Sequence, residues 1–230
     1  MIRICVVSIL ILKLICTDCL SQSSYYAYDH TNFRDIEIFS QVINLDSIDF
    51  PRINAVMFYI TNEIRNKKKL PVLKYNALLE ESATLHSKEM VKRDFFDHIN
   101  KRNKKLQSPN DRALYCGIAN PHLAENIAES FVLKYKAGEK VYPGGKGVFR
   151  YKPEEDPISP HTYLSVAEST LSDWMNSPNH KKNILSADAV ELGCGTAYFI
   201  KKDFNDMPSI YATQNFQLFE PVRQDNENEK

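Results

Sequence analysis

The stretch WMNSPNHKKNIL, residues 174–185, ends one predicted helix and begins the next. Upstream of it the apolar residues recur at helical spacing: Leu164, Ala167, Leu171 and Trp174. This pattern predicts a helix over residues 163–176 with Trp174 on its buried face. Ser177 suits a helix N-cap and Pro178 suits a first helical turn, so a short helix is expected to follow over residues 178–185.

Two more helices are predicted nearer the N-terminus. Asp49 is placed to cap a helix that three lysines, residues 67–69, and then Pro71 bring to an end. Its apolar positions are Ile53, Met57, Ile60 and Ile64. A second helix is expected over residues 76–93, with its stripe at Leu79, Ala83, His86 and Met90. Because His86 lies on this stripe, we expect a buried histidine whose ring nitrogens are hydrogen-bonded.

The second half of the chain has the pattern of strands. Residues 123–135 mix small and β-branched side chains, and two further strands are expected over residues 192–200 and 210–219. A Pro-Gly-Gly segment, residues 143–147, predicts the tip of a hairpin, whereas residues 99–122 are polar and basic and are expected to form a connection. Helices followed by strands favour the α+β class, with an antiparallel sheet.

Composition excludes several classes of protein. The chain has 29 basic and 29 acidic residues, so it offers no net field for a polyanion, and we expect no nucleic-acid partner. Its hydrophobic fraction of 43% is that of a globular domain and too high for a disordered chain.

The N-terminus has the pattern of a secretory signal. Arg3 precedes an apolar run over residues 4–12 that is too short to span a bilayer, and no later stretch is long enough, so we expect no transmembrane span. A buried strand or helix is the alternative, and lipid attachment at Cys16 or Cys19 is less favoured. We therefore expect a protein that is secreted, periplasmic or at the cell surface.

Removal of this signal divides the chain into four parts. Residues 1–21 form the signal peptide, residues 22–50 a leader that packs loosely, residues 51–220 the domain and residues 221–230 a polar tail. Of the five cysteines only Cys116 and Cys194 then remain, and they could pair in an oxidising compartment if geometry allows.

Familiar catalytic motifs are missing from the chain. There is no G-x-S-x-G, H-E-x-x-H, C-x-x-C or Walker sequence, and the glycine cluster at residues 144–147 lacks the spacing of a phosphate loop.

A set of short motifs nevertheless stands in a distinctive order. They are FFDH at residues 95–98, AENIA at 124–128, WMNSPNHKKNIL at 174–185, LGCG at 192–195 and QNF at 214–216. In order and rough spacing they resemble the CAP superfamily, which comprises the cysteine-rich secretory proteins, antigen 5 and pathogenesis-related group 1 proteins. The string typical of animal and plant members is absent, so the chain is more similar to the bacterial SCP domains. The resemblance implies an α–β–α sandwich around a central antiparallel sheet, with a cleft on one side.

The same resemblance implies which residues line that cleft. The family gathers two histidines and two acids there, and the matching motifs assign His98, His180 and Glu125. The second acid would fall at Ser177, where this chain has no carboxylate, and neither Glu168 nor Asp173 matches the pattern. Catalytic roles for His98, Glu125 and His180 are candidates only.

Three functions fit such a cluster. Two imidazoles and a carboxylate could bind zinc or another divalent cation, with an open position for water. The same groups could move protons in a metal-assisted hydrolase acting on a peptide or wall substrate, although the sequence offers no activated nucleophile. The groups could also form a buried hydrogen-bond network in an inert scaffold.

The sequence leans away from an enzyme. We expect a monomeric, exported binding or interaction module with a His/Glu cleft, whose ligand is a lipid, a wall component or another protein. The insertion at residues 132–162 is longer than expected and could rim the cleft, which would make it the place for ligand specificity.

Overall fold

The structure, a computed structural model, describes residues 25–145 and 147–219. The predicted signal peptide and the polar tail therefore lie outside the described residues. The principal helices are α2 (Glu37–Ser40), α3 (Phe50–Lys67), α4 (Ala77–Arg93), α5 (Pro109–Tyr115), α6 (Tyr163–Asn176) and α7 (Pro178–Ile184), with 3-10 turns η1 (Phe33–Asp35), η2 (Lys104–Leu106) and η3 (Lys202–Phe204). The strands are β1 (Lys74–Tyr75), β2 (Leu123–Phe131), β3 (Tyr142–Pro143), β4 (Phe149–Arg150), β5 (Ala189–Lys201) and β6 (Met207–Leu218).

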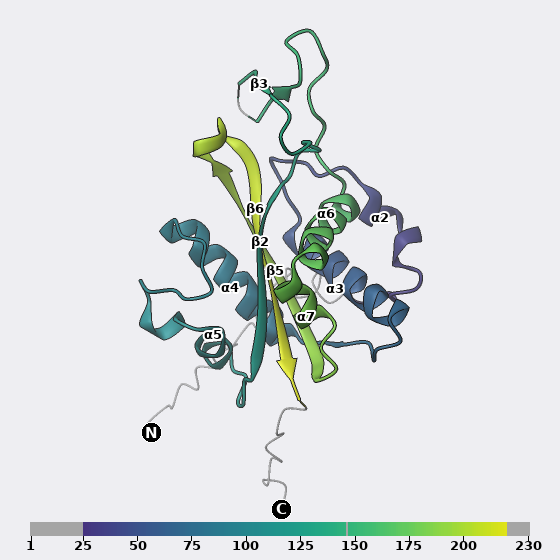
Figure 1. The fold of residues 1–230 in the computed structure, drawn as a ribbon, viewed down its shortest axis with the longest axis vertical. Coiled ribbons are helices and arrows are strands. Elements are labelled where there is room, and N and C mark those ends of the chain that lie inside the picture. The colour runs from purple at the N-terminus through teal and green to yellow at the C-terminus, as the bar shows by residue number, and fades with distance from the viewer. Residues whose placement is uncertain (1–24, 146, 220–230) are drawn as a thin grey trace, which may run out of the picture.

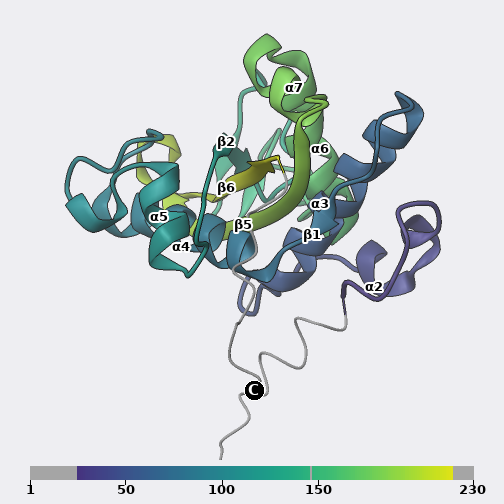
Figure 2. The ribbon, with the colours of Figure 1, turned by 90° about the horizontal axis from the view of Figure 1, so that it is seen from below.

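Four of these strands form the central sheet, in the order β1-β5-β6-β2. Strands β5, β6 and β2 are antiparallel neighbours, whereas the two-residue strand β1 runs parallel to β5. Helices α4 and α5 lie on one face of the sheet, and α3, α6 and α7 lie on the other (Figure 1; Figure 2 shows the same layers from below). The predicted α–β–α sandwich is thus confirmed, apart from the one parallel pair.

Two glycines allow helix α4 to lie directly against strand β5. A Cβ added at Gly193 would stand 2.0 Å from the backbone nitrogen of Glu80, and one at Gly195 would stand 2.0 Å from that of Thr84. Because side chains alternate along a strand, Cys194 between them points to the opposite face. The LGCG motif therefore lets helix α4 pack closely on one face of β5 and places Cys194 on the other face.

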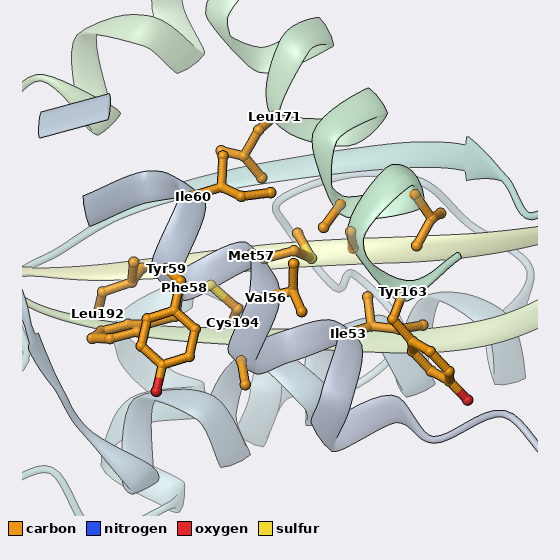
Figure 3. Close-up of a cluster of buried hydrophobic side chains, with 14 of the residues drawn as sticks. Ile53, Val56, Met57, Phe58, Tyr59, Ile60, Tyr163, Leu171, Leu192 and Cys194 are labelled. Atoms are coloured by element: carbon orange, nitrogen blue, oxygen red, sulfur yellow. The ribbon is translucent and has the colours of Figure 1, made fainter. Parts of the chain in front are cut away.

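The main core lies between the sheet and helices α3 and α6. Figure 3 shows Met57, Tyr59, Leu171, Leu192 and Cys194 within it, and each is at most 2% exposed. Burial of such side chains is the main driving force of folding, at about 25 cal/mol per Å² of apolar surface. Cys194 is completely buried here, and Cys116 and Cys194 are both free thiols, so they are not paired.

The leader is part of this core, and the expectation that it packs loosely is wrong. Phe33 and Phe39 are fully buried, and Phe33 stacks on Tyr59 of helix α3. Tyr26 stacks on Tyr75 with ring centroids 3.6 Å apart. The Tyr26 hydroxyl donates to Glu80 Oε2 at 2.7 Å. The aromatic residues of the leader supply contact area that a composition-based interpretation underestimated.

The predicted connection at residues 99–122 contains structure that the sequence analysis did not foresee. Helix α5 begins with a capping box, in which Ser108 Oγ accepts from the Asp111 backbone N–H and the Asp111 carboxylate accepts from the Ser108 backbone N–H. Elsewhere the predicted helices and the hairpin are confirmed to within a few residues, and β6 begins three residues earlier than predicted.

The 132–162 insertion has a small core of its own, formed by Leu133, Phe149, Ile158 and, from strand β6, Met207. Among the described helices, none has both the length and the apolar composition needed to cross a membrane.

Candidate functional site

The carboxylate of Glu125 is the centre of the predicted site. Glu125 lies on strand β2 opposite Asn215 of β6, and its side chain is only 2% exposed. His98 Nδ1 lies 2.9 Å from Oε1, and an Arg112 Nη2–H donates to Oε2 at 2.7 Å. The Asn215 amide, oriented with its nitrogen toward Glu125, also donates to Oε2 at 3.0 Å. Both carboxylate oxygens are therefore occupied by donors from the protein.

Arg112 ties this carboxylate to the preceding loop. Its side chain is completely buried, and the guanidinium also donates to the backbone carbonyls of Leu106, Gln107 and His98. The capping box positions Arg112 one residue after Asp111, at the fourth residue of helix α5. A single side chain therefore fixes the loop that carries His98 relative to strand β2.

These contacts set the ionisation of Glu125. Burial opposes ionisation, but the hydrogen bond from His98 and the positive charge of Arg112 outweigh it and hold the pKa of Glu125 below its usual range. Glu125 is therefore a carboxylate at neutral pH, fully compensated by its partners.

His86 is a further member of the cluster, which the sequence analysis assigned to the core alone. It is fully buried, as predicted, and its Nε2 lies 3.7 Å from Glu125 Oε1. The expectation that its nitrogens are satisfied is met at most weakly: neither makes a hydrogen bond of ordinary geometry among the described residues, and the contact with the Asp97 backbone is a weak one. Burial lowers the pKa of His86 to about 4, so the ring is neutral at physiological pH.

His98 is the accessible member of the cluster, with its side chain 44% exposed. The hydrogen bond to Glu125 raises the pKa of His98 above its ordinary value. Since an ionised Glu125 accepts, Nδ1 of His98 carries its proton, and Nε2 is left free to meet a ligand.

His180 is held at the site by its helix rather than by its own ring. Asn183 Nδ2 donates to the Glu125 carbonyl at 3.2 Å and to Asn126 Oδ1 at 2.9 Å, and Asn126 Nδ2 donates to the His180 carbonyl at 3.2 Å. The Asn183 side chain thus joins helix α7 to strand β2. The asparagines of the AEN and HKKN strings are direct partners.

The His180 imidazole itself makes no hydrogen bond or ion pair within the described parts of the chain. Burial lowers the pKa of His180, and the charge of His98 lowers it further. The two imidazoles that the motifs assigned therefore influence each other electrostatically, while only His98 contacts Glu125.

The second family acid has no replacement here. Ser177 occupies the N-cap position of α7 as predicted, but its side chain makes no cap hydrogen bond. Glu168 forms an ion pair with Arg34 of the leader, and the pKa of Asp173 is raised by burial. Neither acid belongs to the Glu125 cluster.

The donor set does not fit a divalent cation in this arrangement. Metal-binding carboxylates need a free oxygen, whereas both oxygens of Glu125 are engaged and a guanidinium lies beside them, which would repel a cation. In residues 25–145 and 147–219 no group of three or more His, Cys, Asp or Glu side chains is arranged to hold a metal ion. The zinc site at His98, His180 and Glu125 stays a prediction that the contacts do not favour.

Neither described thiol, nor the Ser165 hydroxyl beside His161, is an activated nucleophile. Burial raises the pKa of the Cys116 thiol to about 11 and raises that of Cys194 further. Ser165 Oγ lies 2.8 Å from His161 Nδ1, but the same hydroxyl closes the capping box of helix α6 with Thr162.

Arg112, His86 and Asn215 are the members of the site that sequence reasoning missed. The SPND string at residues 108–111 could have revealed helix α5, and with it a buried arginine one position later. No local signal could have paired Asn215 with Glu125, because that contact depends on the register of β2 against β6.

The buried His86 is expected to make the folded protein less stable in acid. Its folded pKa of about 4 lies below the unfolded value of 6.5, so between these pH values only the unfolded state takes up the proton. Stability is therefore present above pH 6.5 and lost as the pH falls toward 4, by about 3 kcal/mol from His86 alone. Denaturant unfolding of the wild type and of His86→Met, measured from pH 7 to 4, should show a shallower decline in the variant.

The exposed His122 provides the control for this experiment. His122→Met should decline with pH as steeply as the wild type does, because its ring is not buried. Parallel curves for the wild type and His86→Met would contradict the assignment of the acid sensitivity to His86.

Comparisons with known proteins agree with the geometry. A family model described as the cysteine-rich secretory protein family, CAP, matches residues 58–216. The uncharacterized protein YkwD of Bacillus subtilis is 29% identical over 137 residues, which is 59% of this chain and 39% of that protein.

One solved structure shows the same fold. An extracellular protein containing an SCP domain from Bacillus anthracis is 23% identical, with a TM-score of 0.50 over 74% of this chain and 41% of its own. A cysteine-rich secretory protein from Staphylococcus aureus is 17% identical, with a TM-score of 0.44 over 74% of this chain and 39% of its own. The chain thus spans about two fifths of the length of these relatives.

Proposed function

Because the chain belongs to the CAP family of cysteine-rich secretory proteins, we propose that it is an extracellular binding module whose cleft recognises its ligand through His98 and His180. The observation that carries this proposal is the state of Glu125, which is ionised, buried and fully hydrogen-bonded. Such a carboxylate orients His98 but has no free oxygen with which to act on a substrate.

An extracellular location is part of this proposal. It is supported by the signal-like pattern of residues 1–21 and by the extracellular SCP-domain protein of Bacillus anthracis.

The charge of the cluster favours an anionic or polar ligand group. Arg112 compensates Glu125, so protonation of His98, whose pKa is raised, adds one positive charge beside that pair, with Asp97 as a neighbouring acid. A carboxylate of a cell-wall peptide or of a fatty acid would accept a hydrogen bond from the Nε2–H of a protonated His98. We therefore place wall fragments and fatty acids ahead of uncharged sterols among the ligand classes.

A thermal-shift series tests this function. Muramyl dipeptide, a soluble stem peptide, palmitate and cholesterol are each titrated into the wild type, into His98→Ala/His180→Ala and into His122→Ala. Excess ligand at 100 Kd should stabilise the folded protein by about 2.7 kcal/mol, which raises Tm by several degrees. The double variant should lose the shift, because the cleft loses both imidazoles, and the control variant at the exposed His122 should keep it.

The outcomes separate the proposal from its alternatives. No shift with any probe, or the same shift in the double variant, would favour an inert scaffold. Zinc titration by calorimetry addresses the metal-assisted hydrolase: zinc binding by the wild type that the double variant loses, together with turnover of a wall peptide, would replace the binding proposal.

A further inference from the structure

The two edges of the central sheet are closed in different ways. Strand β2 is one edge, and side chains from helices α6 and α7 donate hydrogen bonds to its outward carbonyls. Trp174 Nε1–H donates to the Ile127 carbonyl at 3.0 Å, and Asn183 Nδ2–H donates to the Glu125 carbonyl at 3.2 Å. These donors leave little of that edge available for another strand.

Strand β5 is the other edge, and it is closed only over its first half. The Leu192 carbonyl accepts from the Asn76 backbone N–H beside strand β1, and β1 pairs with only two residues of β5. Thr196 is fully buried, and its hydroxyl donates to Asn54 of helix α3. Beyond Thr196 the strand continues to Lys201, and within residues 25–145 and 147–219 it has a neighbouring strand on one side only.

The register shows which backbone groups point away from the sheet in this second half. In an antiparallel pair, residues that bond the partner strand alternate with residues whose N–H and C=O point outward. Leu192 is an outward residue, and the ladder runs without a shift from Leu192 to Lys201. Tyr198 and Ile200 are therefore outward residues as well.

The far end of the ladder gives the same answer independently. The carbonyl of Pro208, which is paired with Ile200, accepts from Val132 on the β2 side. Pro208 and Ile200 are thus a pair without mutual hydrogen bonds. No backbone hydrogen bond from the described residues reaches the outward N–H and C=O groups of Tyr198 or Ile200.

A cavity lies on each face of this free edge. One, of about 660 Å³, is lined on the α4 side by Met90, Phe199 and Tyr211. The other, of about 740 Å³, is lined by Leu45, Pro143 and Tyr198. Ile200 and Lys202 border both cavities, and Ile200 is 38% exposed. Figure 1 shows the β5–β6 turn lying beyond the end of helix α4.

We propose that the Tyr198–Lys201 edge of β5 is a docking site for an extended polypeptide segment, which would add a strand to the sheet. Only a backbone in extended conformation offers donors and acceptors at the spacing of the outward groups of Tyr198 and Ile200. Successive side chains of such a strand point to opposite faces, so they would enter the two cavities alternately.

The charges around the edge specify the partner further. Four aspartates line the two cavities, Asp46, Asp94, Asp203 and Asp206, against Lys201 and Lys202. Lys201 is already engaged, at 2.7 Å from Glu129 and 3.6 Å from Asp203. The charged side chains that line the two cavities are therefore acidic on balance, and they suit a segment that alternates apolar and basic residues. This site is separate from the Glu125 cluster, because β6 contacts Glu125 at Asn215 and reaches the edge at its other end.

Fluorescence anisotropy with a labelled heptapeptide of alternating valine and lysine tests the proposal. The wild type should bind it, and Ile200→Pro should bind it about tenfold more weakly, because proline removes the outward N–H without removing a bond to β6. Ile200→Thr keeps that N–H and the β-branched shape, so it should bind within about threefold of the wild type.

Changes to the peptide test the same site on the unmodified protein. A peptide N-methylated at alternate residues should lose binding, and a valine–glutamate peptide should bind more weakly than the valine–lysine one. Absence of binding to the wild type, or equal affinity for the N-methylated peptide, overturns the proposal. Equal affinity for the glutamate peptide overturns the basic class of partner. A concentration-dependent dimer in sedimentation velocity that Ile200→Pro abolishes would mean that a second copy of this chain, and not a basic peptide, pairs with the edge.

Discussion

Replacing Gly195 by alanine is expected to destabilise the protein by about 3 kcal/mol or more, with a fall in Tm of about 10 °C. The added Cβ would stand 2.0 Å from the Thr84 backbone nitrogen and 2.4 Å from the Ala83 carbonyl carbon. Both neighbours are helix backbone, so they cannot rotate away as a side chain would. Helix α4 would have to move from strand β5 along the whole of their contact. Thermal unfolding followed by circular dichroism measures the change.

Gly138 provides the matched control. It has a positive φ of 86°, and an added Cβ there would meet nothing within 4 Å. Gly138→Ala should therefore cost only the backbone strain of a left-handed residue, about 1 kcal/mol. A Gly195→Ala protein that melts together with Gly138→Ala would show that α4 and β5 do not require their close approach.

Replacing Arg112 by methionine is expected to destabilise the protein by about 3–5 kcal/mol. The substitution removes the guanidinium from a buried Glu125 and also releases the carbonyls of Leu106, Gln107 and His98. An uncompensated carboxylate in a low-dielectric site shifts its pKa upward, so the variant should unfold most readily at high pH, where that carboxyl must ionise. Urea unfolding at pH 5, 7 and 8.5 measures both effects.

Two companion variants identify the cause of that loss. Arg112→Met/Glu125→Gln removes the unpaired charge and should recover part of the stability. Arg102→Ala, which removes an exposed arginine of the same loop, should stay within about 0.5 kcal/mol of the wild type. Equal stability of Arg112→Met and the wild type would mean that Glu125 does not depend on its ion pair.

Much of the fold could be predicted because its signals are local. The helices that became α3, α4 and α6 each have an apolar stripe and a polar residue at the start: Asp49 accepts from Arg52, Asn76 from Leu78 and Leu79, and Thr162 from Ser165. The two-residue strand β1 has no periodicity to detect, and its parallel pairing depends on where β5 lies. Helix α5 was missed because charged residues in its sequence were interpreted as a solvated loop.

The site was predictable only as far as its motifs extend. His98 and Glu125 are in contact as the resemblance implied, and His180 lies on a helix joined to the same strand through Asn183. The motifs could not show that Arg112 compensates the charge of Glu125. Arg112 lies outside these motifs, so its ion pair with Glu125 follows only from how the fold packs. That compensation argues against metal ligation by Glu125 and supports the binding role expected first from the sequence.

The contacts of Tyr26 limit how far the N-terminus can be shortened without loss of stability. Glu80 is a fully buried acid whose oxygens accept from Asn54 at 3.0 Å and from the Tyr26 hydroxyl at 2.7 Å. Cleavage near residue 21 would keep this tyrosine, whereas trimming by a further half-dozen residues would remove it and leave one Glu80 oxygen without that donor. The α3–α4 layer junction therefore depends on the N-terminal segment, so an exopeptidase that removed Tyr26 would lower the stability of the whole domain.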